Sequence, residues 1–171
     1  MAPYEGKLRK SLLSYVSEVL KYLNTKEYKQ SSFHVGLFNH ELVSLQQVHQ
    51  RADLIQLIDK LVCQGSTALF NTISLGYEYL RDSTKEGKKL CILLTDGHDN
   101  QEDLVGKDRV QRLLESNEVD VVLVGAGWNI DSAVEKYPLY QMIIHQTDQV
   151  DVEEIFLMIS SISKSYFGYL E

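Results

Sequence analysis

The stretch KLCILLTDGHDN, residues 89–100, is a short apolar run that ends abruptly on polar residues. The apolar side chains from Leu90 to Leu94 are followed at once by Thr95, Asp96 and Gly97. A continuous apolar run of this length, bounded by turn residues, is typical of a strand that is buried on both faces. The sequence therefore predicts a buried strand over 90–94 whose carboxyl end leads directly into a carboxylate.

On both sides of this strand the hydrophobic period alternates between the helical value and short strand-like runs. The turn Asn39-His40-Glu41 predicts a hairpin, and so one antiparallel edge strand. Strands separated by helices indicate an α/β fold with a doubly wound, mainly parallel sheet and helices on both faces. The predicted helices are 5–24, 53–61, 69–80, 105–115, 130–135 and 152–163, and the predicted strands are 33–38, 42–45, 90–94, 119–124 and 141–145.

Composition narrows the class of protein. The chain has 171 residues, which suits one domain over 1–171, and a formal net charge of −7, which disfavours nucleic acid as a partner. No apolar run is long enough for a membrane span, and the amino terminus lacks a signal-peptide pattern, so we expect a cytoplasmic protein. The two cysteines, Cys63 and Cys91, lack metal-ligand spacing and are interpreted as core thiols.

The carboxyl edge of the sheet is the expected place for a site, because ligands of open α/β sheets bind outside the carboxyl ends of the strands. Asp96 and the glycines at 125 and 127 follow predicted strands there. No catalytic pattern accompanies them. The histidines are scattered over different elements, Gly125-Ala126-Gly127 is not a complete dinucleotide fingerprint, and Ser66 has no nucleophile elbow. We therefore expect a protein that is not an enzyme.

Local chemistry alone offers simpler readings of two polar residues near this edge. Ser66 or Thr67 would cap the helix that follows, and Asp96 would bond to its own backbone in a turn before Gly97. The wider pattern gives them another role. GSTALFNTISLGYEYL (65–80) and CILLTDGHDN (91–100), in this order, resemble the von Willebrand factor type A domain. FHVGLFNHE (33–41) is similar to the family's second strand, and VDVVLVGAGWNID (119–131) to its fifth, so the resemblance covers essentially the whole chain.

The resemblance implies a metal-ion-dependent adhesion site at the carboxyl edge of the sheet. There, Mg²⁺ or Mn²⁺ would hold an acidic side chain of a partner protein, with Thr67 as a direct ligand and Asp96 as a carboxylate that accepts hydrogen bonds from bound water. Glu5, Asp99 and Asn100 are candidate helpers near the same edge. The family implies a non-enzymatic protein-interaction module.

The sequence departs from the family pattern at one segment. The family's Asp-x-Ser-x-Ser motif, which follows its first strand, is absent from the sequence, and that central strand is missing with it. Thr67 and Asp96 alone make a degenerate site with too few oxygen ligands. Three explanations are possible. The chain begins inside a longer protein, or another chain supplies the strand, or the family's second and fourth strands, which here are 33–38 and 90–94, pair directly. We favour the first, in which case a preceding signal would change the expected localisation.

Two other functions stay open at this stage. One is a receiver-like enzyme that uses Asp96 and Mg²⁺ for phosphoryl transfer, although the acidic cluster and the lysine that such a site needs are not visible. The other is a metal-free structural descendant that binds its partner through apolar surface. Metal dependence distinguishes the latter from an adhesion module.

Overall fold

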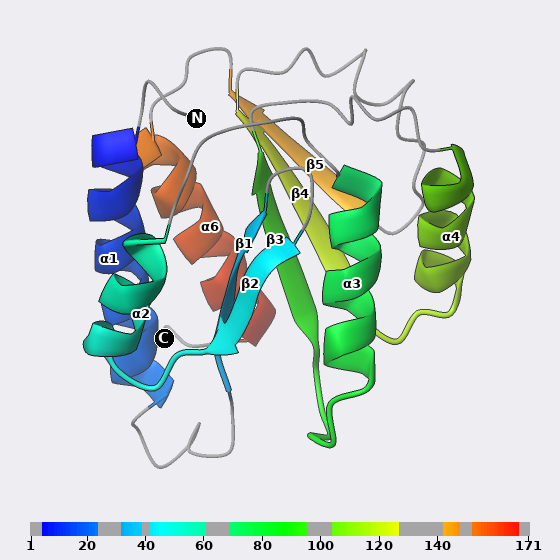
Figure 1. Cartoon of the computed structure of the whole chain (residues 1–171), viewed down its shortest axis with the longest axis horizontal. Coiled ribbons are helices and arrows are strands. Elements are labelled where there is room, and N and C mark those ends of the chain that lie inside the picture. Colours follow the sequence, from blue (N-terminus) through cyan, green and yellow to red (C-terminus); the bar gives the residue numbers. More distant parts are fainter. Residues whose placement is uncertain are drawn as a thin grey trace. The chain divides into compact units, whose positions relative to one another are not determined.

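The computed structural model describes residues 5–23, 32–38, 42–60, 69–95, 104–126, 142–147 and 152–167, and everything below refers to these. They form helices and strands in the alternating order that the sequence predicts (Figure 1). The elements are α1 (Glu5–Leu23), β1 (His34–Phe38), β2 (Leu42–Gln47), α2 (Arg51–Ile58), α3 (Leu69–Arg81), β3 (Leu90–Thr95), α4 (Leu104–Glu115), β4 (Asp120–Ala126), β5 (Met142–Thr147) and α6 (Val152–Phe167).

The predicted boundaries agree with these elements within three residues, except for the end of the last helix. The helix predicted over 53–61 begins earlier, at Arg51, because the Asp53 carboxylate accepts the backbone N–H groups of His49 and Gln50 at 2.9 and 3.1 Å. These bonds lower the pKa of Asp53, the one from His49 most. The last helix runs four residues further than predicted, to Phe167. The helix predicted over 130–135 lies outside the described residues.

Two compact units divide the chain. The first comprises Met1–Leu37, Val43–Gln64 and Asp151–Glu171, and the second comprises Phe38–Leu42 and Gly65–Val150. The strands form two sheets, a pair β1-β2 and a three-stranded sheet in the order β3-β4-β5. Direct pairing of β1 with β3, one of the three possibilities raised by the sequence, stays a prediction, because most of β1 belongs to the first unit and β3 to the second.

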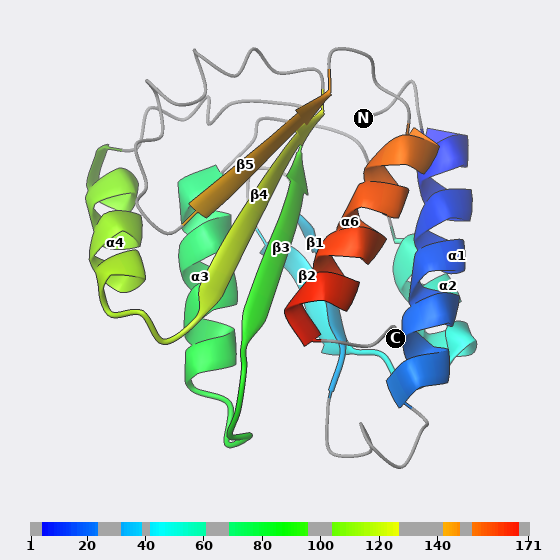
Figure 2. The ribbon, with the colours of Figure 1, turned by 180° about the vertical axis from the view of Figure 1, so that it is seen from behind.

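In the first unit, α1 packs against both α2 and α6 (Figures 1 and 2). The Tyr15 ring of α1 contacts Phe33 and Phe156, with centroid distances of 6.0 and 5.9 Å. The backbone N–H of Val48 donates to the carbonyl of Phe33 at 2.9 Å, which joins the end of β2 to the start of β1, so the hairpin is antiparallel as predicted.

In the second unit, β3, β4 and β5 are parallel, with Leu93 opposite Leu123 and Leu123 opposite Ile144. Val121 and Leu123 of β4 join a buried cluster with side chains of α3 and α4, while Val122 and Val124, on the opposite face of the strand, are also buried. Burial on both faces explains why the sequence of β4 is apolar almost throughout. The apolar runs in the sequence therefore correspond to strands of a parallel sheet, as predicted.

No helix in the described part of the chain is long and apolar enough to cross a membrane.

Candidate functional site

The sequence predicts the candidate site at the carboxyl edge of the three-stranded sheet. In the second unit, the structure describes the strand that ends at this edge and the helix that begins there. The register sets Thr95, the last residue of β3, opposite Gly125 of β4, and Gly125 opposite Gln146 of β5. Helix α3 begins at this same edge and runs back along β3, as both views show (Figures 1 and 2). Asp96 follows Thr95 in the sequence and Thr67 precedes α3 by two positions. The described elements next to these two residues, β3 and α3, end and begin at one edge of the sheet.

A close helix–strand contact holds α3 on β3. Gly76 lies so near Cys91 that a methyl group in place of its hydrogen would be 3.3 Å from the sulfur atom. Any larger side chain at this position would push the helix away from the strand. Burial raises the pKa of the Cys91 thiol to about 12, so this sulfur is a neutral packing group rather than a nucleophile. Cys91 is half-buried and packs against the buried cluster of α3, α4 and β4, which agrees with the expected packing role.

A buried tyrosine anchors the opposite, amino-terminal edge of the sheet. The Tyr77 side chain of α3 is 0% exposed, and its hydroxyl oxygen accepts the backbone N–H groups of Glu118 and Val119 at 3.0 and 3.3 Å. The Ser116 hydroxyl donates to the carbonyl of Leu113, so its oxygen is the acceptor for the Tyr77 O–H at 2.8 Å. This network fixes the turn between α4 and β4.

The same turn carries an unusual backbone conformation. Asn117 has a φ of 60°, and its N–H donates to the carbonyl of Leu114 as α4 ends. Asparagine tolerates this left-handed region better than other side chains, which makes it a natural helix terminator. Together with Tyr77, it sets where β4 begins.

Most candidate ligands named from the sequence lie outside the described residues. These are Thr67, Asp96, Asp99 and Asn100. Glu5 is the first residue of α1, in the first unit, and its side chain is not among those described. Within the described residues, no group of three His, Cys, Asp or Glu side chains could hold a metal ion. The assignment of Thr67 and Asp96 stays a prediction.

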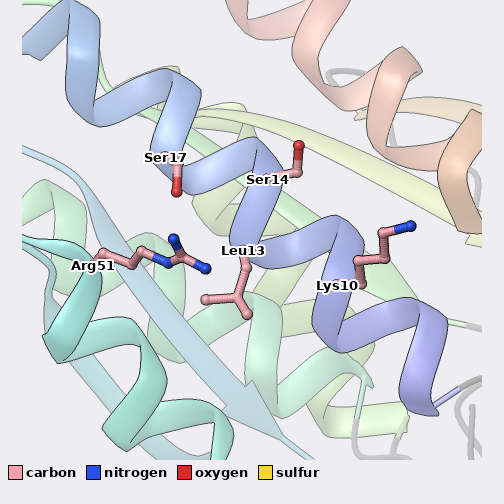
Figure 3. A pocket seen from close by; sticks show the side chains of 5 residues that line it. All are labelled: Lys10, Leu13, Ser14, Ser17 and Arg51. Carbon is pink, nitrogen blue, oxygen red and sulfur yellow. The ribbon is translucent and has the colours of Figure 1, made fainter.

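A hollow in the first unit was not identified from the sequence. It has a volume of about 450 Å³ and is lined by Lys10, Leu13, Ser14 and Ser17 of α1 and by Arg51 of α2 (Figure 3). The spacing of the four α1 residues, at i, i+3, i+4 and i+7, places them on one helix face and was the signal available in the sequence. Arg51 could not have been added, because it is distant in the sequence and comes close only through the packing of α2 on α1.

The described elements form an α/β protein with a parallel three-stranded sheet. The sequence predicts its site at the carboxyl edge of that sheet. The chain belongs to the von Willebrand factor type A domain family, whose model matches residues 6–162. The match extends over parts of both units, and it confirms the family that the sequence resembles.

Solved structures share the fold of this chain. The chain is similar to a von Willebrand factor type A protein from Catenulispora acidiphila, with 16% identity, a TM-score of 0.60, and coverage of 92% of this chain and 39% of that one. It is similar to proximal thread matrix protein 1 from the mussel byssus, whose MIDAS motif is occupied by zinc, with 15% identity, a TM-score of 0.61, and coverage of 92% and 43%.

A third similar structure is the conserved hypothetical protein BatB from Bacteroides thetaiotaomicron, with 14% identity, a TM-score of 0.60, and coverage of 91% of this chain and 88% of that one. The chain thus spans about two fifths of the length of the first two structures and most of the third. At these identities the likeness concerns the fold alone. No protein with a curated description matched the chain.

Proposed function

We propose that this chain is a non-enzymatic protein-interaction module whose recognition surface is the edge that carries Thr67 and Asp96. The observation that supports this most is geometric: β3 ends and α3 begins at one edge of the sheet, next to these two residues in the sequence. Family membership adds the class of function, because von Willebrand A domains generally act as interaction modules. The ligand of this edge would be an acidic side chain of another protein.

We propose further that the cation site of this chain is incomplete. Mg²⁺ and Mn²⁺ prefer near-octahedral coordination by oxygen atoms, and Thr67 and Asp96 contribute one hydroxyl and one carboxylate. The sequence contains no Asp-x-Ser-x-Ser segment to add further oxygens. The zinc-occupied motif of the mussel protein supports cation binding as a capacity of this fold, but the residues present here do not fit a full ligand set. Recognition by residues 1–171 alone would then depend little on metal.

The edge of β3 supports the proposal that the missing strand precedes this sequence in a longer natural protein. Among the described strands, β3 is bonded on one side only, to β4, and its residues Leu90–Leu94 are apolar. Sheet edges are usually protected by charges, bulges or covering segments, so an apolar edge strand favours a further neighbour. The intact mass of the natural protein tests this. We expect a mass above that of residues 1–171, with a preceding Asp-x-Ser-x-Ser segment, whereas an equal mass would contradict the proposal.

Site-specific photo-crosslinking tests the recognition edge. In the 171-residue chain expressed in the source cells, a benzophenone amino acid at position 98, two residues after Asp96, should give a protein adduct. The matched position is Glu86, an exposed residue in the segment before β3, at the opposite end of the strand. We expect an adduct from position 98 and none of the same size from position 86. Equal adducts from both positions would argue against recognition at this edge.

Repeating the reaction in cell extract with Mg²⁺ or with EDTA tests the metal part of the proposal. An incomplete site predicts similar yields in both, and loss of the adduct in EDTA would mean that the cation site is functional. The receiver-like alternative makes a different prediction, since acetyl phosphate with Mg²⁺ would then phosphorylate Asp96. We expect no phosphoryl mass gain, and a gain abolished by Asp96→Asn would favour the enzyme.

A further inference from the structure

The hollow on α1 and α2 offers a second binding surface that does not involve Thr67 or Asp96. All of its lining residues belong to the first unit, whereas Thr67 and Asp96 belong to the second. Figure 3 shows Arg51 extending from α2 toward α1, where Ser17 and Leu13 lie, with Lys10 further along the same helix. The side chains of Lys10, Ser14 and Arg51 are exposed, so a ligand could reach them from solvent.

The polar side chains of this hollow have no protein partner among the described residues. There, neither cation, Lys10 or Arg51, makes a hydrogen bond or an ion pair, and neither do the hydroxyls of Ser14 and Ser17. The carboxylates of α2 and of the residue that ends it have other partners. Asp59 pairs with Arg9 at 3.8 Å, and Asp53 accepts backbone N–H groups at the start of α2. The hollow is therefore a concentration of donors and positive charge on a chain whose formal net charge is −7.

This combination fits an anionic ligand of more than one functional group. A guanidinium can bind a carboxylate through two parallel hydrogen bonds, and an ammonium and hydroxyls can add further donors. The hollow has a volume of about 450 Å³, which is within the usual range for ligand sites and is much more than a single small anion would fill. Leu13 supplies an apolar contact for the aliphatic part of such a ligand. An extended peptide with acidic side chains has all of these features.

We propose that this hollow binds an acidic segment of a partner protein, with one side-chain carboxylate held by Arg51 and a second by Lys10, whose side chains extend in different directions (Figure 3). The surface acts independently of the interaction at the Thr67/Asp96 edge. It would give the module two contacts with its partner protein, and two contacts on one chain raise the overall affinity without either being strong.

A blocked, fluorescein-labelled hexaglutamate peptide is the probe for this proposal. Its binding to the full 171-residue chain is measured by fluorescence anisotropy at an ionic strength of about 0.1 M, where the Debye length is about 10 Å. Amide shifts in ¹⁵N spectra locate the contact, and we expect them to concentrate at residues 10–17 and at Arg51. The double variant Lys10→Glu/Arg51→Glu should weaken binding at least about tenfold, which corresponds to about 1.4 kcal/mol.

The matched control is Lys21→Glu/Lys60→Glu. Lys21 is an exposed residue of α1 and Lys60 an exposed residue just after α2, so this variant has the same net charge but leaves the hollow intact. We expect it to change the affinity less than about threefold, because those charges are screened. Equal weakening by both double variants would show non-specific attraction and overturn the proposal. So would equal shifts of the same amides with inorganic phosphate alone at the same concentration. Asp96→Asn should leave this binding unchanged, so a failure here is separable from a failure of the Thr67/Asp96 edge.

Discussion

Each unit of this chain contains a buried tyrosine that donates its hydroxyl hydrogen to a serine, yet the two networks differ in what they hold. In the first unit, the Tyr15 O–H meets the Ser163 oxygen at 2.9 Å, and Ser163 in turn donates to the carbonyl of Ile159 within α6. The Tyr15 network therefore joins the side chains of two helices. The Tyr77 network of the second unit also accepts two backbone N–H groups, in the turn before β4. A side chain that satisfies backbone is harder to replace than one that bridges side chains.

The largest effect should come from Tyr77→Phe. The substitution keeps the ring but removes the acceptor for the N–H groups of Glu118 and Val119, and Val119 is 1% exposed. An unsatisfied buried donor costs about 1–3 kcal/mol, so we expect a loss of about 2–3 kcal/mol in the free energy of unfolding. Urea denaturation measures it. Amide exchange at Val119 should accelerate in parallel, and an unchanged exchange rate there would contradict the role assigned to Tyr77.

The contact of Gly76 with Cys91 gives the next effect. Gly76→Val places branched carbon atoms against the Cys91 sulfur and should cost about 2 kcal/mol by overpacking. Gly76→Ala is the matched control, because its single methyl group gains helix propensity that offsets a 3.3 Å contact. Adding Cys91→Ala should rescue part of the loss in the valine variant. Strict additivity of the two changes would mean that the helix and strand are not in close contact there.

Tyr15→Phe should have the smallest effect at neutral pH. Ser163 keeps its bond to Ile159, so the loss is that of one ordinary hydrogen bond, about 1 kcal/mol. A loss as large as that of Tyr77→Phe would remove the contrast between the two networks.

The pH dependence sharpens the same contrast. Burial raises the pKa of Tyr15 above its ordinary value of 10.0, so the folded state favours the neutral phenol. This contribution to stability is complete below pH 10 and is lost as the pH rises toward the folded-state pKa. Urea denaturation at pH 8 and pH 10.8 should show that Tyr15→Phe loses less stability on this change than the unsubstituted chain. An equal loss in both would contradict a raised pKa.

The order and type of the elements could be predicted from the sequence because they depend on local periodicity. The strand at Leu90–Leu94 and the stripe that forms α1 are examples, and α3 follows from its apolar spacing. The start of α2 was placed late because Gln50 is not among the usual capping residues, and Asp53 reaches back to supply the acceptor instead. The division of the strands into two sheets depends on pairing between distant segments, which periodicity does not report.

The candidate sites show the same limit. The prediction of a site at the carboxyl edge rests on a general rule for parallel strands, and the register of Thr95 with Gly125 shows that β3 and β4 end together there. The assignment of Thr67 and Asp96 to that edge stays a prediction. The bonds from Tyr77 to Glu118 and Val119 could not be predicted, since 41 and 42 positions separate the partners. The contribution of Arg51 to the hollow could not be predicted either, because Arg51 is distant in the sequence from the α1 residues that line it.

The central claim is that the cation site at the Thr67/Asp96 edge is incomplete, and the affinity of the purified chain for Mn²⁺ tests it most directly. Titration followed by electron paramagnetic resonance would compare the unsubstituted chain with Asp96→Asn and with Asp120→Asn, which removes a carboxylate at the opposite end of the same sheet. We predict no saturable binding below about 1 mM and no difference among the three proteins. Saturable micromolar binding that Asp96→Asn abolishes and Asp120→Asn preserves would contradict this account.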